Sequence, residues 1–86
     1  MYQYYFHIRD GETFLDDAGL HLPNIDAAKA EALRASSEML RVVHAEFWQG
    51  TPWRLWVTDG PSGTGKTLFT LEFSASMNGG DTQLVV

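Results

Sequence analysis

Apolar and polar residues alternate along the first part of the chain. Such a period of two predicts a half-buried β-strand over residues 2–9. Asp10-Gly11 predicts a turn, and residues 13–15 begin a return strand. Residues 16–19 are interpreted as a bend or bulge, after which residues 20–22 resume the alternation. The apolar positions of the first strand are Tyr2, Tyr4, Phe6 and Ile8.

One long helix is predicted from Ile25 to about Phe47. Apolar residues recur there at three- and four-residue steps, while charged residues occupy the opposite face. Asn24 is the expected N-cap, and Gly50 with Pro52 ends the helix. The apolar stripe consists of Ile25, Ala28, Ala32, Leu33, Ala35, Met39, Leu40, Val42, Val43 and Phe47.

The region after the helix alternates again over residues 53–58 and 68–74, with a Gly-rich stretch between the two segments. Two alternating segments joined in this way predict a β-hairpin. The predicted fold class is therefore α+β: a four-stranded antiparallel sheet in ββαββ order, with one long helix packed on one face. Residues 1–76 are expected to form a single domain, and residues 77–86 a flexible C-terminal tail.

The joining stretch matches the phosphate-loop pattern G-x-x-x-x-G-K-[ST], because residues 60–67 are Gly-Pro-Ser-Gly-Thr-Gly-Lys-Thr. In a phosphate loop, backbone N–H groups surround the phosphates, the lysine reaches the β/γ oxygens and the hydroxyl holds Mg²⁺. Such a loop needs a helix directly after it, whereas a strand is predicted here. A hairpin turn is therefore favoured. Phosphate or nucleotide binding is the alternative, through Gly60, Gly63, Gly65, Lys66 and Thr67.

Composition narrows the classes of partner. The chain has 86 residues and a formal net charge of −5, which disfavours nucleic acid as a partner because phosphate backbones attract lysine and arginine. There are no cysteines, so disulfides and thiolate chemistry are excluded. No apolar run approaches the ~20 residues of a membrane span. No secretory signal is recognised, and a cytoplasmic location is expected.

Four side chains form the candidate interaction face. If the apolar set packs on the helix, the alternation turns Tyr5, His7, Arg54 and Trp56 to the other face of the sheet. An open face with aromatic and arginine side chains suits a protein interface, or stacking on a single-stranded nucleic acid. The acidic balance favours the interface. The leading hypothesis is a non-enzymatic, homodimerising interaction module, which acts through this face or the protruding helix end and can take an unidentified protein partner.

Other chemistry is not indicated. His7, His21 and His44 could ligate a metal together with Asp16 or Asp17, but their spacing fits no known metal pattern. The Asp16-Asp17 pair is interpreted as a turn former. No catalytic residue, metal site or cofactor is predicted.

Five segments of the chain carry a family resemblance. They are residues 4–11, 16–23 (Asp-x-x-Gly-x-x-Leu-Pro), 27–33, 53–59 (Trp-Arg-x-x-Val-Thr-Asp) and 68–74 (Leu-x-x-Leu-x-Phe-Ser). Together they span nearly the whole chain, which resembles a family of small uncharacterised bacterial domains that is common in rhizobia and their relatives. That family has no established activity to carry over, and its hairpin turn is usually short and lacks a phosphate-loop pattern, which favours the turn interpretation here. A looser similarity is to HicB-type antitoxins, which implies toxin or RNA binding as a further alternative.

Overall fold

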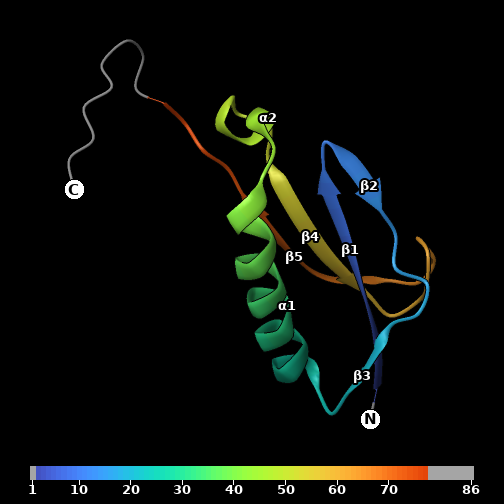
Figure 1. The fold of residues 1–86 in the computed structure, drawn as a ribbon. Helices are drawn as coiled ribbons and strands as arrows, with labels where there is room; N and C mark the ends of the chain where they lie inside the picture. The colour runs from blue at the N-terminus through green and yellow to red at the C-terminus, as the bar shows by residue number, and fades with distance from the viewer. Residues whose placement is uncertain (1, 78–86) are drawn as a thin grey trace.

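The computed structural model describes residues 2–77 and has an α+β fold with an antiparallel sheet and one long helix (Figure 1). Both the fold class and the hairpin at the end of the chain were predicted from the alternation. The predicted tail lies outside the described residues, except for Met77. The elements are β1 (Tyr2–Asp10), β2 (Glu12–Phe14), β3 (Leu20–Leu22), α1 (Ile25–Met39), the 3-10 turn η1 (Leu40–Val42), α2 (Ala45–Trp48), β4 (Trp53–Thr58) and β5 (Thr67–Phe73).

The sheet has five strands, so the predicted four-stranded sheet in ββαββ order is wrong. Its order is β2-β1-β4-β5, and β3 also pairs with β1. The expected return strand is split because residues 15–19 leave the sheet. These five residues stand opposite only residues 5–7 of β1, so they loop out between the two short strands. Gly19 ends this loop with a φ of +74°, a conformation that favours glycine.

The predicted continuous helix is also wrong in its second half. Asn24 caps α1 as expected, and its Oδ1 accepts the N–H of Ala27 at 2.9 Å. The helix ends at Met39, however, and Val43 is extended, with a φ of −75° and a ψ of 156°. A straight helix would run about 33 Å, against about 20 Å for β4. The break lets Val43 and Phe47 pack against the core instead of passing the end of the sheet.

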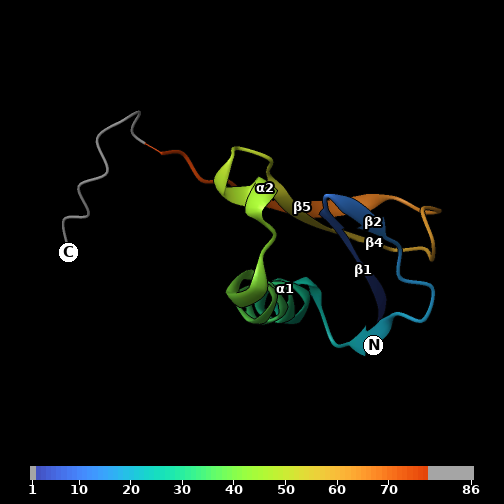
Figure 2. The same cartoon turned by 45° about the horizontal axis from the view of Figure 1, so that its top comes forward.

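Helix α1 lies along one face of the sheet (Figure 2), and the buried core residues come from the helix and the strands that it covers. Small side chains let the helix approach: Ala28 and Ala32 are fully buried and share a core cluster with residues of β1 and β4. The apolar stripe of α1 is narrower than predicted, because Leu33 and Met39 are exposed, as is Val42 in η1. Burial of the other apolar side chains of the helix against the sheet supplies the main driving force for the fold. The buried cluster consists of Tyr4, Ala28, Ala32, Trp53, Leu55 and Val57.

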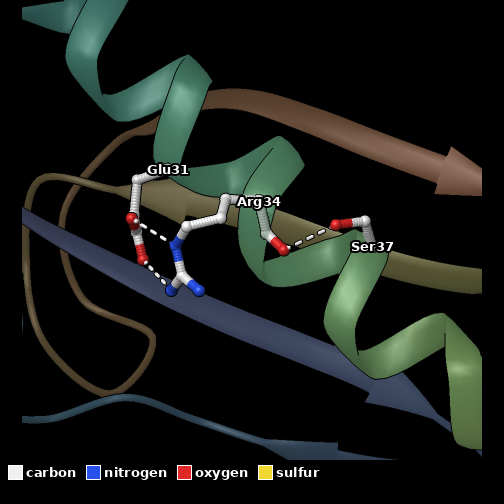
Figure 3. Close-up of polar contacts among 3 residues, drawn as sticks. All are labelled: Glu31, Arg34 and Ser37. Atoms are coloured by element: carbon white, nitrogen blue, oxygen red, sulfur yellow. Dashed lines mark hydrogen bonds and ion pairs between the residues drawn. The ribbon is translucent and has the colours of Figure 1, made fainter.

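The outer face of α1 is polar, as the charge pattern predicted. Arg34 holds Glu31 by two hydrogen bonds, from Nε to Oε1 at 3.0 Å and from Nη2 to Oε2 at 2.6 Å (Figure 3). The Ser37 hydroxyl donates to the carbonyl oxygen of Arg34 at 2.9 Å. The hydrogen bonds that Arg34 donates to Glu31 lower the pKa of Glu31 below its ordinary value. Within residues 2–77, no helix combines the length and the apolar character that a membrane span requires.

Candidate functional site

The sheet face turned away from α1 carries three rows of side chains, which the strand register aligns. The row at one end contains Arg9, Arg54 and Glu72, and the middle row contains His7, Trp56 and Thr70. The third row begins with Tyr5, opposite Thr58. The register thus puts the four residues of the candidate interaction face, Tyr5, His7, Arg54 and Trp56, on one face of the sheet, in three different rows.

His7 is not exposed on this face, contrary to the expectation for an interaction residue. Its side chain is fully buried, and its ring packs against Trp56 at a tilt of 37°, with centroids 5.3 Å apart. Nδ1 accepts the backbone N–H of Asp16 at 3.0 Å, so Nε2 carries the proton and donates to Thr58 Oγ1 at 2.8 Å. Burial lowers the pKa of His7 below its ordinary value, and the nearby Asp16 carboxylate offsets this only in part. His7 is therefore a neutral structural residue.

Asp16 connects the loop of residues 15–19 to the sheet and to the Gly-rich loop. Its Oδ2 accepts the N–H of Phe6 at 3.1 Å. Phe6 lies in the part of β1 that pairs with neither β2 nor β3, so Asp16 replaces a strand as the acceptor for this N–H. Its Oδ1 accepts the N–H groups of Ala18 and Gly19, and its backbone oxygen accepts the N–H of Ser62 at 2.9 Å. Burial opposes ionisation, but the backbone donors outweigh it and hold the pKa of Asp16 below its ordinary value. The turn-forming role was predicted, whereas the contact with Ser62 was not.

The octet with the phosphate-loop pattern joins two strands. β4 ends at Thr58 and β5 begins at Thr67, so a strand follows the loop where a phosphate loop has a helix. The hairpin prediction is confirmed. Gly63 and Gly65 have φ values of +87° and +81°, which explains the glycines by the shape of the turn.

Backbone N–H groups of this loop bond within the protein. The Lys66 N–H donates to Oδ1 of Asp59 at 2.6 Å, and the Asp59 N–H donates back to the Lys66 carbonyl at 3.1 Å. The Thr64 N–H donates to Pro61, and the Thr58 hydroxyl donates to the carbonyl oxygen of Gly60 at 2.6 Å. The Asp59 carboxylate thus accepts a hydrogen bond from the Lys66 N–H, a backbone group that would point toward the ligand in a phosphate loop.

The other half of the face is open and forms a shallow groove of about 600 Å³. Arg54 donates to Glu72 Oε2 from Nε at 3.0 Å and from Nη2 at 2.5 Å, and both side chains are 47% exposed. Arg9 stands directly across from Arg54 and forms no ion pair within residues 2–77. The sequence reasoning missed Arg9, although the alternation already places it on the same face as His7. The groove is lined by Arg9, Arg54, Trp56, Thr67, Thr70 and Glu72.

The three histidines do not converge. His7 is buried beside the loop of residues 15–19 and the Gly-rich loop between β4 and β5. His21 lies on β3, and His44 Nε2 is 3.8 Å from Asp10 Oδ2. In the part of the chain that the structure describes, no group of three or more histidine or acidic side chains is placed to hold a metal ion.

Comparisons with known proteins agree with the organisation of the chain. Neither the curated proteins nor the solved structures contain a match to it. A family model matches residues 3–74, a range that includes every helix and nearly every strand residue described above. The chain belongs to the family described as the domain of unknown function DUF6894.

Proposed function

We propose that this domain is a non-enzymatic protein-interaction module that homodimerises through the outer edge of β5. The observation that carries the proposal is the position of β5. It is the last strand in the sheet order and pairs only with β4 among the described residues. A seven-residue edge of unpaired backbone groups is a template for another strand.

The register indicates which backbone groups face outward. The Phe6 N–H points away from β4, because it donates to Asp16. Backbone groups of successive residues alternate in direction, so His7 faces β4 and its partner Trp56 faces β1. Thr70 pairs with Trp56 and therefore turns its N–H and C=O to the open edge. Glu72, two residues later, does the same.

The apolar side of β5 also favours a partner. Phe69, Leu71 and Phe73 lie on the core face but stay only half-buried. The backbone of α1 comes near β3 and β4 at more positions than it comes near β5. A second β5, antiparallel and centred on Thr70, would place Phe69 against Leu71 of the other copy on both sides of the two-fold axis. Such cross-strand pairs stabilise a sheet by about 0.2–1 kcal/mol each.

The edge lacks two of the features that keep edge strands apart. β5 contains no proline and no lysine, and its one charged residue, Glu72, is paired with Arg54. In the antiparallel pairing centred on Thr70, each Glu72 faces the Leu68 region of the other copy. The two carboxylates are therefore not opposed.

Sedimentation equilibrium with edge variants tests the proposal. The wild-type chain is expected to have twice the monomer mass at about 100 µM and to dissociate on dilution. Thr70→Pro removes the central outward N–H without removing a bond to β4, and is expected to be monomeric. The matched control Thr70→Ala keeps the N–H and should still dimerise. Heteronuclear spectra report whether both variants fold. A wild-type monomer at every concentration, or a folded Thr70→Pro dimer, would contradict the proposal.

The earlier alternatives stay predictions. No observation on the described residues favours nucleotide binding through residues 60–67 or an antitoxin role.

A further inference from the structure

The open half of the sheet face has an excess of positive charge. Arg9 and Arg54 are paired across β1 and β4 and both line the groove, whereas Glu72 is the one carboxylate that lines it. A second hollow, of about 310 Å³ at the end of these strands, is also lined by both arginines. The pair therefore lies between two concave surfaces in a chain whose formal net charge is −5.

The pair of Arg54 and Glu72 shows which chemistry fits. Two nitrogens of Arg54 hold one carboxylate oxygen of Glu72, at 3.0 and 2.5 Å. Arg9 has no such carboxylate among the described residues, and the half-buried Trp56 next to the pair offers an indole against which an aliphatic stem can pack. Guanidinium groups bind carboxylates well because their planar donors match the acceptor oxygens.

We propose that this groove binds acidic side chains of a partner protein, with Arg9 and Arg54 holding the carboxylates and Trp56 packing against their stems. The groove is shallow, so it would leave much of a free small molecule in water, whereas small-ligand sites bury most of their ligand. A side chain of a larger partner has its own chain to supply further contacts. The net charge repels a polyanion more strongly than one or two carboxylates.

Peptide titration of the 86-residue chain, followed by ¹H–¹⁵N NMR, tests this assignment. The probe is the blocked peptide acetyl-Ala-Glu-Ala-Glu-Ala-amide, whose alternate carboxylates project to one side of an extended chain. Saturable shifts are expected at the Nε–H groups of Arg9 and Arg54 and at the Trp56 indole N–H. Arg9→Gln is expected to weaken binding at least five-fold. Arg41→Gln removes an exposed arginine of η1 and is expected to change binding less than two-fold.

Glu72→Gln supplies a test in the opposite direction. Loss of the carboxylate that competes for Arg54 is expected to tighten peptide binding at least two-fold. The same peptide with glutamine in place of glutamate should not bind, and acetate should bind at least five-fold more weakly than the acidic peptide.

Four outcomes would overturn the proposal. They are shifts that do not saturate, equal effects of Arg9→Gln and Arg41→Gln, acetate as strong as the peptide, or inorganic phosphate bound more tightly at the same residues. The dimer is read out by mass and the groove by chemical shifts. Failure of one proposal is therefore distinguishable from failure of the other.

Discussion

The two halves of the sheet face opposite α1 satisfy their polar groups in different ways. Around Tyr5, His7 and Thr58, the loops of residues 15–19 and 59–66 cover the strands, and side-chain polar atoms bond to backbone groups of those loops. Around Arg9 and Arg54, no loop within residues 2–77 lines the groove over the strands. Arg54 has a carboxylate partner there, and Arg9 has none among the same residues.

The difference separates stability from recognition. A buried donor or acceptor that loses its partner costs about 1–3 kcal/mol, so the covered half is sensitive to small changes. An exposed ion pair contributes about 0–1 kcal/mol, so the open half is free to vary in sequence without unfolding the domain. The covered half should therefore respond in stability, and the open half in binding.

Asp16→Ala is expected to have the largest effect on stability. It removes a half-buried carboxylate and leaves the N–H groups of Phe6, Ala18 and Gly19 without their acceptor. We expect the free energy of unfolding to fall by about 2–4 kcal/mol, measured by urea denaturation. Asp17→Ala removes the same charge from the exposed neighbouring residue and should change the free energy of unfolding by less than about 0.5 kcal/mol. Equal losses in the two variants would contradict the role given to Asp16.

Gly65→Ala tests the second loop. A Cβ there would clash with Asp59 Oδ1 and lie 2.5 Å from the backbone nitrogen of Gly60, at a φ of +81°. We expect a loss of about 2–3 kcal/mol, from backbone strain plus displacement of Asp59. Gly11→Ala has a similar φ of +72° but an unobstructed Cβ, and should cost about 1 kcal/mol. A Gly65 variant as stable as the Gly11 variant would show that the loop adapts without cost.

Much of the sheet was predictable because burial of one face imposes a period of two. The alternation of residues 2–9 and 53–58 located β1 and β4 almost to the residue, whereas the pairing of these two strands was not predicted. The cover over His7 was not predictable in this way. It depends on Asp16 and Ser62, which belong to loops without periodicity and meet only after the chain has folded.

The helix shows a second limit of the pattern. Leu33 and Val42 extend the apolar stripe in sequence, but the line of small residues Ala28 and Ala32 decides which side of the helix approaches the sheet. Periodicity identifies an apolar side, whereas side-chain volume decides how closely it packs. Arg9 was overlooked for a different reason, since a single exposed arginine has no distinctive sequence context.

The pH dependence of stability should report the covered half. His7 binds a proton more readily in the unfolded chain, where its pKa is near 6.5, than in the folded protein, where burial lowers it. The contribution of neutral His7 to stability is therefore fully present above about pH 6.5. As the pH drops below this value, the free energy of unfolding falls, by up to about 1 kcal/mol at pH 5.5. Asp16, whose folded pKa is also lowered, is ionised in both states over this range and adds its loss only at more acidic pH.

NMR of the imidazole nitrogens provides the direct measurement for His7. Below pH 6.5, His7 is expected to keep the neutral form with the proton on Nε2, the form that its two hydrogen bonds require. His21, exposed on β3, is the internal reference. A His7 resonance that titrates at or above pH 6.5 would be inconsistent with a neutral, buried ring.

The smallest expected change in stability comes from the open half. Glu72→Gln breaks the ion pair with Arg54, the best-formed polar contact of the groove, but both side chains are 47% exposed. Water and salt screen such a pair, so the free energy of unfolding should change by less than about 0.5 kcal/mol. A loss above about 1 kcal/mol would mean that the groove is part of the structural framework. A negligible change, together with tighter binding of the acidic peptide, would mean that this carboxylate limits access to Arg54 and leaves the fold unaffected.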